Sequence, residues 1–448
     1  MTARRFVAIL VIILVSWFAS GITRADELTA TVGKRGVVIP EGTFDFRYFP
    51  DEPVSVLSRS PLKFLMVVGD KTVLMEGSSF EKAKPSKVVL EPSKKAGTYD
   101  EHYTGISSVY VDAKKKEVLG FFHAEKPTGG KNKEGTHRFY ATIGLAVSED
   151  GGQTFKKIGP IICGPAEDPD WKGTAQGNAD VSVCLDHTGK WLYAYYTEHS
   201  RKDPATGKTR SVITCMARSK VEDGARPGTW KKYYNGSFDE PGLGGKDSEV
   251  ANCWAPQVTY IPEMKKYVML GNRGCVGFYS SDDGIKWANP VILFKMDDVP
   301  MIGHEIAIHP CLHIEKASAT EATGYVFYAY SPNYGHEKPK SSHHFVKQPI
   351  TIKLSGTATP ADGAEGLKKK LAGTKWVNSN KVSFEWTADG RFLHKGVERE
   401  WKVIDGGRVQ VVFKADHVDT LVFNESFTEF KQLIKGGPDS LQGKRAKE

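Results

Sequence analysis

Short runs of apolar residues, either continuous or alternating with polar ones, follow one another along almost the whole chain, and helical periodicity is nearly absent. The runs are rich in Val, Ile, Tyr, Phe and Thr and are interrupted by Gly, Asp, Asn and Pro, which is typical of β-strands joined by turns. Ile106–Val111, Val118–His123 and Trp191–Thr197 are examples. The pattern predicts an all-β protein.

The predicted strands fall into groups of about four. The clearest group consists of Gly105–Asp112, Val118–Ala124, Tyr140–Ser148 and Phe155–Ile162. Three later groups begin at Ala179, Pro256 and Ile306, and an earlier, weaker one begins at Val54. Repeated units of this kind indicate a β-propeller, in which radial repetition leaves only short, protected sheet edges. Two β-sandwiches in tandem are the alternative, but the matching signals inside the groups favour a five-bladed propeller over residues 26–354.

One matching signal is a turn motif that occurs twice. Ser148–Phe155 and Ser280–Trp287 both read Ser-x-Asp-x-Gly-x-x-aromatic, between the third and fourth strands of their groups. In such a turn the Asp accepts backbone N–H bonds, the Gly takes a positive φ, and the aromatic residue covers the blade edge. The motif resembles the Asp box of sialidases and related propellers. We therefore expect Asp150 and Asp282 to have structural roles.

A second, smaller domain follows. Residues 355–366 are small and polar, as in a linker. Renewed alternation predicts a small antiparallel β domain over residues 367–435, and the polar residues 436–448 are expected to be a disordered tail. Trp376, Trp386 and Trp401 have the ring faces needed to stack on sugars, but the alternation favours core packing for at least two of them.

The first 25 residues predict an export signal. Arg4 and Arg5 precede the apolar run Phe6–Phe18, and Thr23–Ala25 offers a small-residue cleavage site. The run is shorter than the ~20 residues needed to span a bilayer, so cleavage is favoured over a retained membrane anchor. We expect a secreted or periplasmic protein.

Charge gives little support to a nucleic-acid partner. Loss of the signal removes three arginines and lowers the formal net charge from +8 to +5. The basic residues are scattered among acids, and the runs Lys114–Lys116 and Lys368–Lys370 contain no aromatic residue. We expect a solvated surface, with no membrane contact after cleavage.

The mature chain keeps six cysteines: Cys163, Cys184, Cys215, Cys253, Cys275 and Cys311. An even number in an exported protein permits disulfides, but six cysteines allow 15 pairings and the sequence does not choose among them. Several lie inside apolar strand patterns, where a buried thiol is at least as reasonable as a bridge. None has the spacing of a zinc-binding motif.

Chemistry is expected at the start of each group, because the innermost strands of a propeller line its central funnel. The residues at these starts are Glu101-His102-Tyr103, Asn178-Ala179-Asp180, Asn252-Cys253-Trp254 and His304-Glu305.

One group resembles a blade of glycoside hydrolase family 43. The segment Cys253–Val258, the strand Lys266–Leu270 and the turn ending at Trp287 are similar to that family's Trp-Ala-Pro-Asp stretch, tyrosine-rich strand and Ser-Asp-Asp-Gly-x-x-Trp turn. The match is firm over some 40 residues and extends over residues 53–354 only as a rhythm of blades.

This resemblance implies a five-bladed propeller with three funnel acids: an Asp base, a second Asp that tunes pKa, and a Glu acid. Together they would hydrolyse a glycosidic bond with inversion, which needs two carboxyl groups ~6.5–9.5 Å apart, one of them kept protonated. The chain departs from the family at Gln257, where the family has Asp, and its first group lacks the usual early Asp-Pro.

The candidate catalytic acids are therefore Asp180 as base, Glu305 as acid, and Glu101 as a third carboxylate. Each has a plainer alternative, since an acid at the start of a strand often caps a turn or pairs with a lysine. The candidate substrate-binding residues are Trp254, Arg273, Gln257, His102 and His304. For Trp254 a core position, and for Arg273 a surface turn, is equally reasonable.

A metal site is not expected from the histidines. His304 and His309 are five residues apart, which places them on opposite faces of a strand. His309 and His313 share a face but lie roughly 13 Å apart. No cofactor is required, although the resemblance implies that a central calcium is possible, reached through water by His102 or His304.

Three functions remain open. The leading hypothesis is a monomeric glycoside hydrolase acting on extracellular polysaccharide or oligosaccharide. The second is a non-catalytic carbohydrate-binding propeller, favoured by Gln257 and the missing Asp-Pro. The third is a sialidase-like enzyme, which needs three converging arginines to bind a carboxylate; Arg138, Arg218 and Arg273 are available.

Overall fold

The computed structural model describes most of residues 28–354 and 367–446. The gaps are residues 47–48, 132–136, 169, 172, 200–211, 274, 289, 296–303 and 335–342 in the first part, and 406–407, 415–416, 424–427 and 434–439 in the second. The predicted signal, residues 1–25, and the predicted linker, residues 355–366, lie outside the described residues. Within the described residues, no helix has the length and apolar character needed to cross a bilayer.

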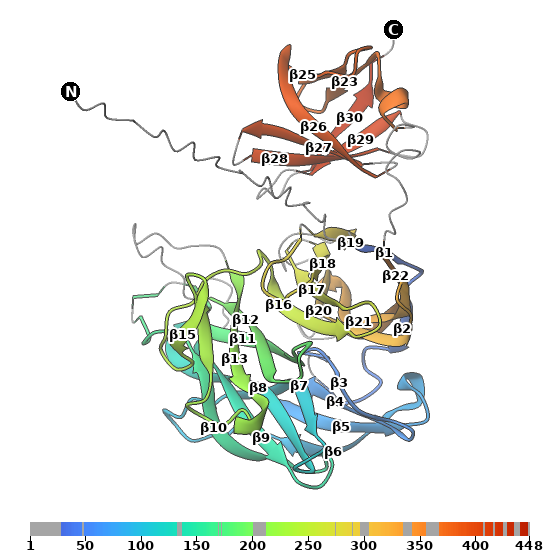
Figure 1. Cartoon of the computed structure of the whole chain (residues 1–448). Helices are drawn as coiled ribbons and strands as arrows, with labels where there is room; N and C mark the ends of the chain where they lie inside the picture. Colours follow the sequence, from blue (N-terminus) through green and yellow to red (C-terminus); the bar gives the residue numbers. More distant parts are fainter. Residues whose placement is uncertain are drawn as a thin grey trace, which may run out of the picture.

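Residues 28–354 form a five-bladed β-propeller, as the sequence predicts. The blades follow one another in chain order around a common centre (Figure 1). Blade 1 contains β3 (Ser55–Arg59), β4 (Leu62–Val68), β5 (Lys71–Gly77) and β6 (Lys84–Leu90); blade 2 contains β7 (Tyr103–Asp112), β8 (Glu117–Lys131), β9 (His137–Ser148) and β10 (Lys156–Cys163). Blade 3 contains β11 (Ala175–Leu185), β12 (Trp191–Glu198), β13 (Ile213–Lys220) and β14 (Lys231–Tyr234), extended by β15 (Ser237–Pro241); blade 4 contains β16 (Trp254–Ile261), β17 (Lys266–Asn272), β18 (Cys275–Ser281) and β19 (Val291–Lys295).

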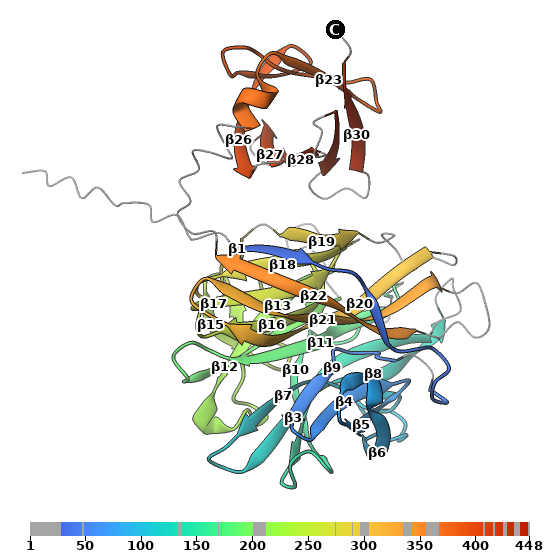
Figure 2. The same ribbon diagram turned by 90° about the vertical axis from the view of Figure 1, so that its right-hand side faces the viewer.

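Blade 5 is completed by the N-terminus. Its strands β20 (His304–Ala317), β21 (Glu321–Tyr334) and β22 (His344–Leu354) are joined by β1 (Leu28–Val32), which pairs antiparallel with β22 (Figure 2). The next strand, β2 (Gly36–Ile39), pairs with the other end of β22. This addition covers an edge that would otherwise present unpaired backbone groups to solvent. The sequence showed only three strands in this group because the fourth comes from the opposite end of the domain.

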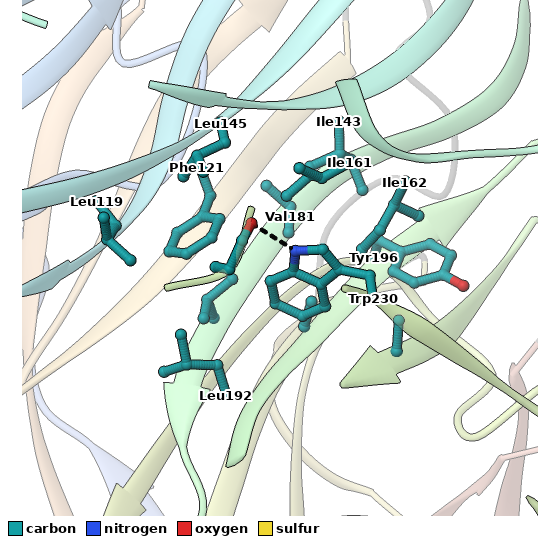
Figure 3. Close-up of a cluster of buried hydrophobic side chains, with 14 of the residues drawn as sticks. Leu119, Phe121, Ile143, Leu145, Ile161, Ile162, Val181, Leu192, Tyr196 and Trp230 are labelled. Atoms are coloured by element: carbon teal, nitrogen blue, oxygen red, sulfur yellow. Dashed lines mark hydrogen bonds between the residues drawn. The ribbon is translucent and has the colours of Figure 1, made fainter. Parts of the chain in front are cut away.

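Neighbouring blades pack through apolar side chains. The cluster between blades 2 and 3 brings Phe121 and Leu145 against Val181 and Tyr196 around the buried ring of Trp230 (Figure 3). The Trp230 indole N–H, which would be costly to bury unpaired, donates to the carbonyl of Ala225 at 3.0 Å. The cluster fixes the inner strand of blade 3 relative to blade 2.

Polar bonds between the innermost strands add to this packing. Ser108 Oγ of β7 accepts the amide of Val183 in β11, and Ser182 Oγ of β11 accepts that of Val258 in β16, each at 2.9 Å. In the same way, Gln257 Oε1 of β16 accepts the amide of Leu312 in β20, also at 2.9 Å. These bonds satisfy buried backbone groups at the junctions between blades. At one junction the backbones also pair directly, because β11 of blade 3 runs parallel to β9 of blade 2 over Ala175–Gly177.

The two repeated turn motifs are structural, but the second is shifted by one residue. Asp150 Oδ1 accepts the amides of Gln153 and Thr154 at 2.8 and 2.9 Å. In the second motif these bonds are made by Asp283 Oδ1, to Ile285 and Lys286. Asp282 pairs instead with the ammonium group of Lys266 at 2.5 Å. Assigning the turn role to Asp282 was wrong, because two adjacent aspartates match one pattern and only the turn geometry distinguishes them.

The C-terminal part is a closed antiparallel β-barrel (Figure 2). Its strands are β23 (Thr374–Asn378), β24 (Ser383–Trp386), β25 (Phe392–His394), β26 (Val397–Asp405), β27 (Arg408–Lys414), β28 (His417–Phe423), β29 (Glu429–Leu433) and β30 (Ser440–Arg445). A helical turn over residues 367–371 places Leu367 and Leu371 in the core. Trp376 and Trp386 are also buried there, which confirms core packing for two of the three tryptophans.

The predicted disordered tail is wrong for residues 440–445. These residues form β30, which pairs with β29 on one side and with β23 on the other and so closes the barrel. A Cβ on Gly443 would lie 2.2 Å from the ring of Phe430, so a glycine is required for this close approach. The polar composition of these residues does not predict a strand, because its backbone hydrogen bonds are made to two other strands, β23 and β29.

All six cysteines lie in the described part of the chain, and the structure forms no disulfide among them. Cys253 and Cys311 are buried, in line with their positions in apolar strands.

Candidate functional site

Three innermost strands share a bulge that carries one residue in the left-handed conformation. These residues are Asp180 in β11, Ala255 in β16 and His309 in β20, with φ of 49°, 47° and 54°. The pairing register of each strand shifts around that residue. A non-glycine residue at positive φ costs on the order of 1–3 kcal/mol, and such strain is concentrated at functional sites. The three bulges indicate one level of the propeller at which the direction of the side chains changes.

Asp180 and His309 meet a carboxylate from blade 1 at this level. Ligand-type atoms of Glu52, Asp180 and His309 all lie within 4.8 Å of one another, and all three residues are buried. Glu52 directly precedes Pro53 at the start of blade 1 and is 1% exposed. The equivalent residue of blade 4 is Ala255, which brings no polar side chain to this level.

Two residues of β8 extend the group. His123 Nδ1 lies 3.0 Å from Glu52 Oε1, and His123 Nε2 lies 3.7 Å from Glu125 Oε1. On the other side, His309 Nε2 lies 3.8 Å from Asp51 Oδ1. We call the whole set the central cluster: Asp51, Glu52, His123, Glu125, Asp180 and His309.

The tyrosine at the start of β7 anchors the cluster to blade 2. The Tyr103 hydroxyl donates to the Asp51 carbonyl at 2.9 Å, and its ring packs against that of His123 with centroids 5.1 Å apart. The Asp51 amide donates to Val67 O at 3.1 Å. These contacts fix the segment that carries Asp51 and Glu52.

Burial dominates the electrostatics. It raises the pKa of Glu52 well above its usual range, with further contributions from Asp180 and Glu125. Burial also raises the pKa of Glu125 to about 7, opposed by His123 and reinforced by Asp51 and Asp180. The pKa of His309 is lowered to about 4, because burial disfavours its charged form more than the Asp180 carboxylate favours it. His309 is therefore neutral at neutral pH.

The cluster holds four carboxyl groups without a basic partner. Among the residues that the structure describes, no lysine or arginine forms an ion pair with Asp51, Glu52, Glu125 or Asp180. Burying uncompensated carboxyl groups costs several kcal/mol each unless they are protonated, hydrogen-bonded or bound to a cation. Such a group can transfer protons or coordinate a metal ion, and we treat it as the candidate site.

Of the three predicted catalytic acids, only Asp180 belongs to this cluster. Glu305 is paired with Arg35 at 3.0 Å, and its side chain is 42% exposed. The same Arg35 guanidinium lies 3.7 Å from the ring centroid of Tyr330. The assumed equivalence of Glu305 and Asp180 was wrong, because the bulge places His309, four residues later, at that position.

Glu101 also lies outside the cluster. Its Oε2 accepts the amide of Gly97 at 2.6 Å, the turn-capping role that was the plainer alternative. His102 donates its backbone amide to Glu125 O, while its exposed ring lies near that of His137. The side chain of His304 lies outside the described residues.

The other predicted binding residues are dispersed. Gln257 donates to Thr259 Oγ1 at 3.2 Å in addition to its bond to Leu312, so its side chain is used in joining blades 4 and 5. Arg273 donates to Val212 O at 3.4 Å. Trp254 begins β16 and is half-buried.

Sequence reasoning missed Glu52, His123, Glu125 and His309 as site residues. Glu52-Pro53, Ala255-Pro256 and His309-Pro310 share the form x-Pro at the same level of three blades, a signal that becomes visible once the groups are aligned on it. Glu52-Pro53 thus lies at the start of blade 1, the position at which the resemblance implies an Asp-Pro. For His123 and Glu125 the only signal is two polar residues, two positions apart, directly after the apolar run Val118–Phe122.

A cavity of about 750 Å³ lies further along the same strands. Its lining includes Pro53, Ser182 and Cys311, which are one or two residues beyond Glu52, Asp180 and His309. Several of its polar groups are engaged in bonds between blades, as with Ser182 and Gln257. The ionisable groups are concentrated in the cluster, so we place the candidate chemistry there and not in the cavity.

No family model and no curated protein matches the sequence. Solved structures with a similar fold include an N-acetylgalactosamine deacetylase from F. plautii, at 12% identity and a TM-score of 0.43 over 72% of this chain and 95% of that one. A family 117 glycoside hydrolase from Zobellia galactanivorans matches at 10% identity and a TM-score of 0.46 over 72% and 91%. A family 43 glycoside hydrolase from Xanthomonas citri matches at 11% identity and a TM-score of 0.42 over 69% and 91%.

The propeller is assigned from the strand pairing of this chain itself. The solved structures are similar to it at 10–12% identity, which says nothing of its activity.

Proposed function

We propose that the protein is a hydrolase of extracellular polysaccharide or oligosaccharide, with the central cluster as its reaction centre. The observation that carries this proposal is the convergence of four carboxyl groups, those of Asp51, Glu52, Glu125 and Asp180, around His123 and His309 at the middle of the propeller. A protein that only binds sugars needs aromatic rings and amides at this place, not several buried acids.

The two closest acids do not suit the acid–base pair of an inverting enzyme. The nearest oxygens of Glu52 and Asp180 lie within 4.8 Å of each other, too close to hold both a glycosidic bond and a water molecule between them. The imidazole ring of His123 lies between Glu52 and Glu125. We therefore assign the base role to Asp180 and the acid role to Glu125, with Glu52 between them.

Two features that favoured a non-catalytic protein have structural explanations. Gln257 is a connector between blades 4 and 5, so an ionisable group at that position is not required. The missing Asp-Pro of blade 1 is replaced by Glu52-Pro53, whose carboxylate reaches the same centre.

The sialidase alternative lacks its arginine triad. Arg218 lies over the rings of Trp191 and Phe238, whereas Arg138 and Arg273 donate to separate backbone carbonyls. Among the described residues, these arginines form no common site.

The proposal is tested by reducing-sugar release from a panel of plant and algal polysaccharides. Asp180→Asn and Glu125→Gln are each expected to lose at least about a hundredfold in rate, the usual contribution of a general acid or base. Glu101→Gln is the matched control, because it removes a carboxylate from a turn outside the cluster.

Equal loss in Glu101→Gln and Asp180→Asn would contradict the assignment of the centre. No release by the wild-type protein, together with glycan binding on the same panel, would identify a carbohydrate-binding propeller instead.

We also propose that the protein is exported after cleavage following Ala25. Mass spectrometry of protein from the culture medium or periplasm should give a chain that begins at Asp26, and a chain that keeps residues 1–25 would refute this.

A further inference from the structure

The donor set at the centre of the propeller is that of a transition-metal site. Glu52 and Asp180 each offer a carboxylate oxygen and His309 offers a ring nitrogen, all within 4.8 Å of one another. Ligands that share one ion at bonds of ~2.0–2.2 Å cannot be more than ~4.4 Å apart, so small side-chain movements would complete the site. Catalytic zinc sites likewise use three protein ligands, drawn from His, Asp/Glu and Cys, and leave the fourth position to water.

One polar atom of Glu52 and one of His309 are buried without a hydrogen-bond partner. Glu52 Oε2 is buried and has no hydrogen-bond partner, although Glu52 is 1% exposed. His309 Nδ1 likewise has none, and His309 is 7% exposed. Buried carboxylate and imidazole atoms are rarely left unsatisfied, and each one calls for a specific explanation.

The surroundings supply the outer contacts that a metal site requires. Glu52 uses its other oxygen, Oε1, to contact His123 Nδ1 at 3.0 Å, which fixes the carboxylate and leaves Oε2 available. Asp51 lies 3.8 Å from His309 Nε2, on the opposite side of the ring from the unpartnered Nδ1. A carboxylate beside the second nitrogen of a ligating histidine orients the ring and raises its basicity as a ligand.

The calcium ion implied by the sequence resemblance does not fit these residues. Calcium takes six to eight oxygen ligands, whereas this site has a nitrogen donor among three protein ligands. His102, one of the two residues expected to approach the ion, lies outside the cluster with its ring near His137. Imidazole together with carboxylate suits a first-row transition metal.

We propose that Glu52, Asp180 and His309 bind one divalent first-row transition-metal ion. The ion offsets the two carboxylate charges that no lysine or arginine of the described chain neutralises, and it occupies the space beside Glu52 Oε2. A carboxylate that holds the ion is not free to act as a base, so the base role assigned to Asp180 applies to the ion-free protein. The binding of the ion does not depend on the proposed function.

Zinc alone is the probe. The mature chain, freed of any tag, is stripped with a chelator and titrated with Zn²⁺ by calorimetry. We expect one equivalent to bind, and Glu52→Gln, Asp180→Asn and His309→Gln each to weaken binding at least tenfold. His123→Asn should also weaken it, by about 10- to 100-fold, through the orientation of Glu52. Glu101→Gln and Glu305→Gln, which remove acids outside the cluster, should bind as wild type does.

A melting experiment separates a lost ligand from a damaged fold. In chelator, Glu52→Gln should melt no lower than wild type, because it replaces a buried acid that has no lysine or arginine partner with a neutral side chain of the same shape. Added Zn²⁺ should raise the melting temperature of wild type and leave that of Glu52→Gln unchanged.

Binding of less than half an equivalent would overturn the proposal, as would equal loss in the two control variants. Calcium or magnesium binding as tightly as zinc would overturn the transition-metal assignment. If zinc fails to bind while sugar release still requires Asp180, the proposed function stands without the ion. If zinc binds and no polysaccharide is cleaved, the ion site stands without that function.

Discussion

The buried lysine of blade 3 gives the sharpest test of the packing around the site. Lys232 in β14 is fully buried, and its ammonium group donates to Asp247 Oδ2 at 3.1 Å and to Asn178 Oδ1 at 3.0 Å. It also donates to the carbonyls of Cys163 and Gly245, at 2.8 and 3.1 Å. Lys232→Met keeps the apolar stem and removes all four bonds at once.

The expected loss is large because the partners stay buried. Breaking a buried ion pair from one side costs about 3–5 kcal/mol, mainly through the uncompensated charge left behind, here on Asp247. An unfolding entropy of ~2.1 cal/mol/K per residue, over the roughly 330 residues of the propeller, converts this loss into a fall in melting temperature of about 4–7 °C.

The assay is thermal and urea unfolding of a double-mutant cycle. Asp247→Asn, combined with Lys232→Met, removes the stranded charge, so the double variant should be more stable than the sum of the two single losses by about 1–3 kcal/mol. Lys231→Met is the matched control: it lies on the same strand but is exposed, and a change within about 0.5 kcal/mol is expected.

A loss below about 1 kcal/mol in Lys232→Met, or strict additivity in the cycle, would refute this reasoning. Either result would mean that water or a different arrangement satisfies Asp247 in solution.

Three further predictions concern the site and the barrel. Gly177→Ala should destabilise the protein by more than 2 kcal/mol, because the added Cβ would lie 2.3 Å from Ala141 O and the residue has a φ of +81°. Gly189→Ala, at a φ of +70° in open space, is the control that carries only the backbone strain of ~1 kcal/mol. Equal unfolding free energies of the two variants would count against the clash. In metal-free buffer, the raised pKa of Glu125, about 7, means that the folded state holds the carboxyl proton more tightly than the unfolded chain does. The contribution of this proton to the free energy of unfolding is complete below the unfolded pKa of 4.5, and about 3 kcal/mol is lost as the pH rises through 7. Glu125→Gln should remove most of this dependence in urea unfolding between pH 5 and pH 8, and an unchanged pH profile would contradict the burial of the carboxyl group. Deletion of residues 440–448 should open the barrel and expose it to limited proteolysis while the propeller stays protected, whereas deletion of 447–448 alone should have no effect; a protected barrel in the longer deletion would show that β30 is dispensable.

The sequence determined the strands and the number of blades. Alternation with a period of two and the chemistry of Gly, Asp and Asn in turns act over a few residues. The strands of each blade can therefore be predicted from that blade's own segment of the sequence. The role of Asp150 could be predicted for the same reason, because every bond it makes lies within six residues.

Closure of the sheets was decided by the tertiary structure. β1 completes blade 5 by pairing Leu28 with Leu354, and β30 closes the barrel by pairing Arg445 with Trp376. The composition of these segments does not reveal such partners, because the bonds are made by backbone groups that every residue carries.

The candidate site shows the same division. Asp180 was predicted because it stands near the start of an innermost strand, which is a local property. The equivalence of His309 rather than Glu305 depended on where a bulge shifts the register of β20, and one shifted residue changes which side chain reaches the centre. Glu52, His123 and Glu125 come from a loop and a second strand, and only the folding of two blades around one axis brings their side chains together.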